Sequence, residues 1–262
     1  MLRVLDNFFN RFRQNKNIDN LNDRTTIMDV KDFQVVEPYK QLRTNIVFAM
    51  SVRNTSVIEI SSSYPGEGKS ITSANVAIAM AQTGAKVLLI DCDLRKSVQH
   101  KIFKVENKLG LSSILGKMAT FEDCVHKEVT KNLDLISSGP IPPNPSELIA
   151  SQNMKNFIEE VQKNYDYVIV DTPPIGVVSD ALELSQYTGG LVIVTRQGVT
   201  TYEDVKRTLS SAKFLNVNIL GLVVNGIEDS KFNGYGKYNK YKKYGKYGKY
   251  SYSYGEEKGK KT

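Results

Sequence analysis

The chain has 262 residues, of which 35 are Lys or Arg, 28 are Asp or Glu and two are Cys, and its formal net charge is +7. This length is enough for one α/β domain of roughly 200 residues that buries its own core. Two cysteines are too few for a disulfide framework, no apolar run approaches the roughly 18 residues of a membrane span, and no signal-peptide pattern starts the chain. The composition therefore favours a reducing compartment and excludes secreted and integral-membrane proteins.

The excess positive charge is concentrated in the tail of the chain. Residues 231–262 contain ten Lys and two Glu, a net charge of +8, so residues 1–230 carry 7 − 8 = −1. A near-neutral globular part offers no basic binding face, so we expect no nucleic-acid partner. Composition divides the chain into an N-terminal segment with a linker (1–32), a globular domain (33–230) and a tail (231–262) with too few aliphatic residues to fold alone.

The first sixteen residues carry an amphipathic pattern. Such a helix lies on an anionic membrane surface, or it docks on the domain or on another subunit, and both interpretations stay open. Residues 17–31 are polar and are expected to form a linker. The apolar residues at helical spacing are Leu2, Leu5, Phe8, Phe9 and Phe12.

The globular domain alternates short apolar strands with helical segments. The expected strands are Val57–Ser61, Val87–Asp91, Leu133–Ile136, Tyr167–Asp171, Leu191–Thr195 and Ile219–Asn225. The expected helices are Lys69–Gln82, Ser146–Lys163, Ser179–Ser185 and Tyr202–Phe214. Because the strands are continuous apolar runs, the pattern predicts a doubly wound, mostly parallel α/β sheet with helices on both faces. Ligands of such sheets bind at the carboxyl ends of the strands.

Residues 57–70, VIEISSSYPGEGKS, combine a strand, a glycine-containing turn and the start of a helix. Backbone N–H groups in such a loop bind phosphates, so the segment predicts a P-loop. Lys69, a candidate catalytic residue, would reach the β- and γ-phosphates of ATP, and the Ser70 hydroxyl would ligate Mg²⁺. The motif is a variant, because Ser63 stands where the usual string has Gly. The expected nucleotide contacts are Pro65, Gly66, Glu67, Gly68, Lys69, Ser70 and Ile71.

Three carboxylates follow buried strands. Asp91 and Asp93 end the run VLLIDCD, and Asp171 ends the run YVIVD, the Walker B position. We expect these candidate catalytic residues to hold Mg²⁺ together with Ser70. Asp91 is the preferred general base, although the sequence does not divide the roles of Asp91 and Asp93. Arg95 would contact phosphate or remain solvated.

These motifs resemble those of the bacterial tyrosine kinases of capsule and exopolysaccharide synthesis, of the CpsD/CapB type. That family is related to the MinD/ParA ATPases, which carry a signature Lys five residues before the P-loop Lys. Tyr64 occupies that place here and favours the kinase branch. The segments Glu37–Arg43 and Ser138–Leu148 are also similar to the kinases. The resemblance covers residues 34–228 and the tyrosine-rich tail.

The resemblance implies an ATP- and Mg²⁺-dependent non-specific protein-tyrosine kinase that regulates polysaccharide polymerisation and export. It implies a cytoplasmic position at the inner face of the membrane, a transmembrane co-polymerase adaptor whose intracellular tail activates the kinase, and a cognate tyrosine phosphatase. Glu37, Lys40 and Arg43 match the family's E-x-x-R-x-x-R subunit contact in a homo-oligomeric ring, with Lys40 replacing the middle Arg. Asn225 matches a position that contacts adenine in related nucleotide-binding proteins.

The tail carries eight of the fourteen tyrosines. We expect these tyrosines to be autophosphorylated, with transfer between subunits, because an unfolded tail is accessible. Tyr/Lys stretches also bind RNA by stacking and charge, which is the other interpretation of this pattern. The tyrosines are Tyr235, Tyr238, Tyr241, Tyr244, Tyr247, Tyr250, Tyr252 and Tyr254.

A MinD/ParA-like ATPase switch without kinase activity is the alternative function. Such a switch would use ATP hydrolysis to change dimerisation and membrane attachment. Tyr64 and the tyrosine tail both count against it.

Overall fold

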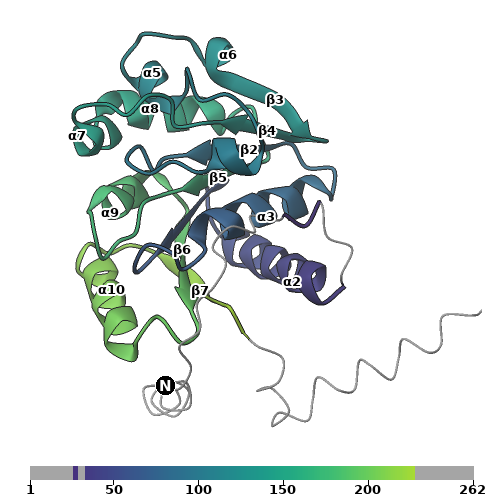
Figure 1. Cartoon of the computed structure of the whole chain (residues 1–262), viewed down its shortest axis with the longest axis vertical. Helices are drawn as coiled ribbons and strands as arrows, with labels where there is room; N and C mark the ends of the chain where they lie inside the picture. Colours follow the sequence, from purple (N-terminus) through teal and green to yellow (C-terminus); the bar gives the residue numbers. More distant parts are fainter. Residues whose placement is uncertain (1–25, 29–32, 228–262) are drawn as a thin grey trace, which may run out of the picture. The chain divides into compact units, whose positions relative to one another are not determined.

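The computed structural model describes residues 26–28 and 33–227, which form an α/β domain with helices on both faces of one sheet (Figure 1). The sheet has seven strands in the order β3-β4-β2-β5-β1-β6-β7. The expected amphipathic segment 1–16 and the tail 231–262 lie outside the described residues. The strands are β1 (Val57–Ser62), β2 (Val87–Asp91), β3 (Val125–Thr130), β4 (Leu133–Ile136), β5 (Tyr167–Asp171), β6 (Gly190–Arg196) and β7 (Ile219–Asn225).

The sheet is parallel except for β3. All six expected strands are present within one residue of their predicted bounds, and each pairs in parallel with its neighbours among the six. The sequence did not indicate β3, which lies antiparallel to β4 at the edge. Its residues are half-buried or exposed, and its register shifts between His126 and Thr130. An edge strand of this kind lacks the continuous apolar run that identifies the buried strands.

The helices differ from prediction because four of them, α2 and the short helices α4, α5 and α6, were not expected, and because one expected helix is divided. No helix was expected before β1, yet α2 is 18 residues long. The single helix expected over 146–163 is two helices, because the Ser151 hydroxyl accepts a hydrogen bond from the Met154 N–H and starts α8. The helices are α2 (Phe33–Met50), α3 (Lys69–Ala81), α4 (Gln99–Ile102), α5 (Leu111–Leu115), α6 (Phe121–Cys124), α7 (Pro145–Ile149), α8 (Gln152–Val161), α9 (Asp180–Leu184) and α10 (Tyr202–Phe214), with a 3₁₀ turn η1 (Ser185–Tyr187).

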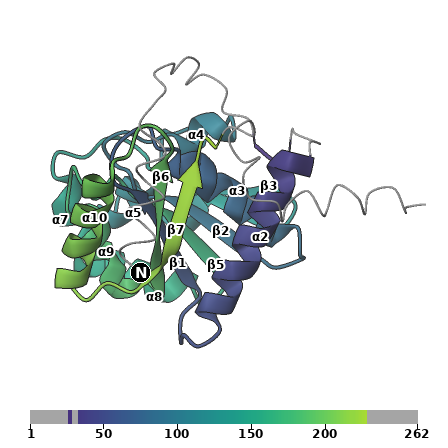
Figure 2. The same ribbon diagram turned by 90° about the horizontal axis from the view of Figure 1, so that it is seen from below.

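Each face of the sheet has its own apolar core. Ile58 and Ile60 of β1 point towards α2 and α3, where they pack with the alanine-rich side of α3. Val57 of β1 packs on the opposite face with residues of α5 and α8. Further along that face, α9 and α10 cover β6. Figures 1 and 2 both show α2 and α3 on one side of the sheet and α8, α9 and α10 on the other. The doubly wound arrangement expected from the sequence is confirmed.

The short segment 26–28 packs against the domain. Ile27 is 4% exposed and belongs to the core beside α2 and α3. Its backbone N–H donates to Asn75 Oδ1 of α3 at 2.9 Å. This part of the expected linker is therefore held on the domain. A boundary between two compact units falls after Gly226. In the described part of the chain, no helix is long and apolar enough to cross a membrane.

Glu59 is a fully buried carboxyl in the interior strand β1. Its Oε2 accepts a hydrogen bond from the Ser185 hydroxyl at 2.6 Å, whereas Oε1 has no hydrogen-bond partner among the described residues. Burial raises the pKa of Glu59 to about 8, even though the Ser185 and Thr172 hydroxyls act to lower it. The folded chain therefore keeps this carboxyl protonated at neutral pH.

This carboxyl makes stability depend on pH in a defined direction. Between about pH 4.5 and pH 8 the unfolded chain releases the Glu59 proton and the folded chain retains it. The free energy of unfolding therefore falls as pH rises through this window, by about 1.4 kcal/mol per pH unit from this group. We expect Glu59→Gln to remove this contribution. The free energy of unfolding of the variant, taken relative to that of the wild type, should therefore be higher at pH 8 than at pH 5. Denaturant unfolding at both pH values measures it, and parallel pH profiles for the two proteins would contradict it.

Candidate active site

The loop between β1 and α3 has the backbone of a phosphate-binding turn. Gly66 and Gly68 both have positive φ angles, 84° and 94°, a conformation that side chains with a Cβ rarely adopt. Gly68 is the N-cap residue of α3, and the helix begins at Lys69. Backbone N–H groups and the N-terminus of a 13-residue helix thus meet at the carboxyl end of β1, as the P-loop motif predicts.

Hydrogen bonds with residues distant in sequence hold this loop in place. Asn225, at the end of β7, donates through Nδ2 to the carbonyl of Glu67 at 3.0 Å and to Thr72 Oγ1 at 3.2 Å. The Glu67 carboxylate is buried and accepts hydrogen bonds from the Tyr64 N–H, at 2.8 Å, and from the Thr200 hydroxyl. Burial raises the pKa of Glu67. Asn225 therefore contacts the loop itself, and the backbone N–H is the group of Glu67 that remains for a nucleotide.

The other residues of the loop that were expected to contact the nucleotide differ in their exposure. Pro65 and Gly66 are exposed, and Pro65 has no N–H with which to bind a phosphate. Ile71 is half-buried on the first turn of α3. Lys69 and Ser70, in contrast, are both buried.

Lys69 and two carboxylates form the centre of the site. The Lys69 ammonium lies 2.9 Å from Asp93 Oδ2, 3.6 Å from Asp171 Oδ1 and 3.2 Å from the Ser70 hydroxyl. Asp171 Oδ1 also accepts a hydrogen bond from Ser73 at 3.2 Å. Burial lowers the pKa of Lys69, but its attraction to Asp171 and Asp93 outweighs burial and raises it overall. The structure thus brings Lys69, Ser70, Asp93 and Asp171 together as the sequence predicts.

Asp91 organises the loop after β2. Its Oδ1 accepts from the Asp93 N–H at 3.2 Å, and its Oδ2 accepts from the Val98 and Gln99 N–H groups, each at 3.0 Å. Burial, followed by repulsion from Asp171, raises the pKa of Asp91 to about 7. A carboxylate with a pKa near 7 is suited to accept a proton at neutral pH.

Gln99 and Ser73 are site residues that the sequence analysis missed. Gln99 Nε2 donates to Asp171 Oδ2 at 2.8 Å and to the Ser70 carbonyl at 2.9 Å. No motif marks Gln99, because it lies eight residues after Asp91 and reaches the site only through the turn that Asp91 holds. Ser73 lies one helical turn after Lys69 and hydrogen-bonds to the Lys69 carbonyl at 2.9 Å.

Arg95 lies at the rim of the site, with its side chain 41% exposed. Its Nε is 3.4 Å from Asp180 Oδ2, and its Nη2 donates to the Ser146 hydroxyl at 2.7 Å. Ser146 in turn donates to Asp180 Oδ1 at 2.6 Å. One edge of the guanidinium is therefore held by residues at the starts of α7 and α9, so Arg95 is more constrained than a solvated side chain.

The predicted subunit-contact residues lie on α2, away from the P-loop. Glu37 and Lys40 form an ion pair with each other at 3.5 Å. Arg43 Nη1 donates to the carbonyl of Ala79 in α3 at 3.0 Å, so part of its guanidinium joins α2 to the domain. Exposed apolar residues also lie on this helix, Phe33 at 70% and Phe48 at 81%.

The donor set fits a Mg²⁺ ion that arrives with a nucleotide. Within residues 26–28 and 33–227, no group of three or more His, Cys, Asp or Glu side chains is arranged to hold a metal ion by itself. Mg²⁺ does not need such a cage, because it usually binds one or two carboxylates, substrate phosphates and several waters. The buried Gln99 Oε1 also lacks a hydrogen-bond partner among these residues and could accept from a water.

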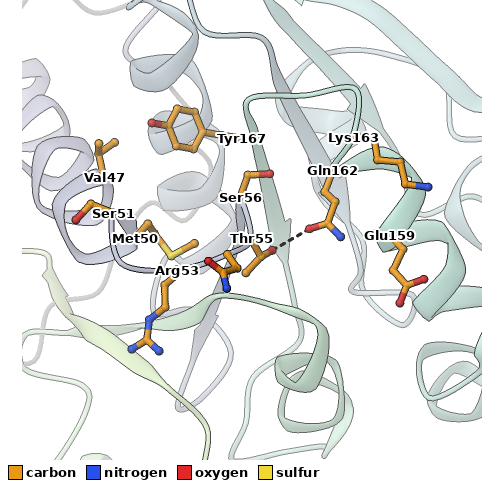
Figure 3. A pocket seen from close by; sticks show the side chains of 11 residues that line it. Val47, Met50, Ser51, Arg53, Thr55, Ser56, Glu159, Gln162, Lys163 and Tyr167 are labelled. Atoms are coloured by element: carbon orange, nitrogen blue, oxygen red, sulfur yellow. Dashed lines mark hydrogen bonds between the residues drawn. The ribbon is translucent and has the colours of Figure 1, made fainter.

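A separate cavity of about 860 Å³ lies at the opposite end of the sheet. It opens between the end of α2, the end of α8 and the residues before β1, and Figure 3 shows Thr55 and Gln162 hydrogen-bonded across it. It borders the amino ends of β1 and β5, whereas ligands of parallel sheets bind at the carboxyl ends. The cavity is thus distinct from the P-loop site.

Relatives that match this chain in sequence include named tyrosine kinases. Residues 55–211 match the family model described as an AAA domain. The chain is 45% identical over 200 residues to the tyrosine-protein kinase YwqD of Bacillus subtilis, and the match covers 76% of this chain and 84% of YwqD. Of two longer tyrosine kinases that it matches, it spans 28% and 30% of the length.

Solved structures agree with this similarity. The kinase domain of the Escherichia coli tyrosine kinase ETK has 33% identity and a TM-score of 0.72, and the match covers 85% of this chain and 80% of that one. The chimerical protein CapA2B2 has 40% identity and a TM-score of 0.70, with 74% and 85% covered. The septum site-determining protein MinD of Pyrococcus horikoshii shares the fold alone, at 23% identity and a TM-score of 0.55 over 65% and 70% of the two chains. The chain therefore belongs to the bacterial tyrosine-protein kinases, enzymes built on a P-loop nucleotide-binding fold.

Proposed function

We propose that the chain transfers the γ-phosphate of Mg·ATP to the tyrosines of its own tail, with transfer between subunits, and thereby regulates capsular or exopolysaccharide polymerisation and export. One observation carries the catalytic part of this proposal. The Lys69 ammonium in the P-loop lies within 3.6 Å of a carboxylate oxygen of Asp93 and of Asp171, which come from two other segments of the chain. A lysine and carboxylates in this arrangement are suited to position Mg·ATP and to neutralise the charge of the transferred phosphoryl group.

Each residue of the centre has a proposed role. Lys69 leaves its carboxylate partners to contact the β- and γ-phosphates, and the P-loop N–H groups bind the same phosphates. Ser70, Asp93 and Asp171 would hold Mg²⁺, which supplies charge neutralisation at the phosphates when bound. Asp91, the general base that the sequence favours, would accept the proton of the acceptor tyrosine.

The acceptor of the phosphate is proposed to be the tail. Phosphorylation of a tyrosine adds a charge of about −1.5 to −2, so full modification of eight tyrosines reverses a tail that carries +8. Transfer between subunits needs an assembly of kinases, for which Glu37, Lys40 and Arg43 on α2 are the proposed contacts. A transmembrane adaptor would hold the kinase at the inner face of the membrane and activate it, and a cognate phosphatase would reset the tail.

A mixing experiment tests both the acceptor and the transfer between subunits. One protein carries Lys69→Met with its tail intact, and the other keeps Lys69 but has its eight tail tyrosines replaced by Phe. After incubation with Mg·ATP, we expect peptide mass spectrometry to find phosphotyrosine on the tail of the Lys69→Met protein only in the mixture. Each protein alone should gain less than about a tenth of the wild-type phosphate.

Different outcomes contradict different parts of the proposal. Phosphate on the wild-type tail but none in the mixture would contradict transfer between subunits. Phosphate that persists in the protein without tail tyrosines would contradict the tail as the acceptor. Consumption of ATP with no phosphotyrosine in any sample, including the wild type, would contradict autophosphorylation itself.

A further inference from the structure

Gln99 contacts three of the predicted motifs at once. It is the first residue of α4 and is fully buried. Its side-chain Nε2 donates to Asp171 Oδ2 at 2.8 Å and to the Ser70 carbonyl at 2.9 Å. Its backbone N–H donates to Asp91 Oδ2 at 3.0 Å. This one residue therefore links the end of β5, the P-loop helix and the loop after β2.

The chemistry of these partners fixes the orientation of the amide. The carboxylate of Asp171 and the carbonyl of Ser70 can only accept hydrogen bonds, so both must face the NH₂ group of Gln99. The Gln99 Oε1 atom therefore contacts neither of them. It is buried and has no hydrogen-bond partner among the described residues. A buried amide oxygen of this kind needs a hydrogen-bond donor, which a water or a group of a bound ligand can supply.

We propose that Gln99 is a positioning residue of the Mg·nucleotide site and that its Oε1 accepts a hydrogen bond from a water bound to Mg²⁺. The inference rests on the Mg·ATP site proposed above. Mg²⁺ in nucleotide sites keeps several waters, and such waters donate hydrogen bonds to neighbouring oxygens. Because Gln99 also holds Asp171 and the Ser70 backbone, it orients two of the proposed metal contacts as well as the hydration shell.

Two substitutions at Gln99 give opposite expected results. The measured quantity is the ratio of the ADP dissociation constant in EDTA to that in Mg²⁺, from titration calorimetry. Gln99→Met removes the oxygen and the NH₂ group at similar volume, so the ratio should fall by about 10-fold or more, the usual effect of losing an outer-shell partner. Gln99→Glu keeps an oxygen but replaces the NH₂ donor with a second acceptor beside Asp171 and the Ser70 carbonyl. The added negative charge should weaken ADP binding in EDTA and attract Mg²⁺, so the ratio should rise above the wild-type value.

A residue that only supports the fold would change the ratio in the same direction in both variants, or not at all. Either result would overturn the inference. Gln162→Met is the matched control, because Gln162 hydrogen-bonds to Thr55 at the opposite end of the sheet and should leave the ratio unchanged. Thermal unfolding of each variant checks that it is folded, and if Gln99→Met is not, a ratio for Gln99→Glu at or below the wild-type value overturns the inference.

The proposed function and this inference fail in distinguishable ways. A wild-type ratio of one would contradict the Mg²⁺ dependence of the site, and the role of Gln99 with it. A wild-type ratio well above one that neither variant changes would contradict the role of Gln99 alone. Binding of Mn²⁺ to the ADP complex, followed by electron paramagnetic resonance, should weaken in Gln99→Met in parallel with the ratio and gives a readout independent of catalysis.

Discussion

Replacement of Lys69 by Met is expected to lower the rate of tyrosine phosphorylation by about 10³-fold or more. Lys69 is 8% exposed and is the cation that lies between Asp93 and Asp171. Without Lys69, no lysine would offset the charge of these carboxylates beside the γ-phosphate. Cations that contact the transferred phosphate raise the rate of phosphoryl transfer by several powers of ten. The rate of phosphotyrosine formation in single-turnover experiments with Mg·ATP measures the effect.

Lys86→Met is the matched control for this experiment. Lys86 is also a lysine but directly precedes β2, and its ammonium lies 4.7 Å from the ring centre of Tyr165 and takes no part in the site. We expect this variant to phosphorylate at close to the wild-type rate. Because loss of Lys69 leaves Asp93 and Asp171 without their cation, far-UV circular dichroism should accompany the assay. A folded Lys69→Met protein with a rate within tenfold of the wild type would contradict the assigned role.

Replacement of Gly68 by Ala is expected to weaken nucleotide binding by roughly 30-fold. A Cβ at Gly68 would collide with Asn225 Nδ2. Asn225 could move only by losing its hydrogen bonds to Glu67 and Thr72, each worth about 1 kcal/mol, and a loss of about 2 kcal/mol corresponds to roughly 30-fold. The displaced loop would no longer present its N–H groups to the phosphates. Titration with a fluorescent ADP analogue measures the change.

Gly84→Ala separates the collision from backbone strain. Gly84 follows α3 and has a φ angle of 95°, close to the 94° of Gly68, but a Cβ there meets no atom within 4 Å. We expect this variant to lose about 1 kcal/mol of stability and to bind nucleotide as the wild type does. Equal affinities for the Gly68 and Gly84 variants would show that the contact with Asn225 is irrelevant to nucleotide binding.

Asn225 illustrates how the tertiary structure changes an interpretation made from a motif. The resemblance to related nucleotide-binding proteins implied an adenine contact for Asn225, and the structure adds two hydrogen bonds from its amide to the P-loop segment. Glu67 is similar, because its position in the loop suggested a nucleotide contact while its carboxylate is buried against Thr200 and the Tyr64 N–H. In both cases residue type and spacing located the residue in the site but did not determine which way the side chain points.

The sequence by itself determined the parallel sheet, the P-loop and the carboxylates that meet it. These features depend on local patterns, because buried strands are continuous apolar runs and parallel strands bring their carboxyl ends to one edge. Lys69, Asp93 and Asp171 could therefore be brought together without a structure.

Only the tertiary structure decided the features that depend on contacts between residues far apart in the sequence. The edge strand β3 depends on pairing with β4, and α2 packs on α3 in spite of Pro38 within it. Gln99 reaches Asp171, 72 residues away, because Asp91 holds the intervening loop. Such contacts arise from long-range packing and buried hydrogen bonds, which leave no periodic signal in the sequence.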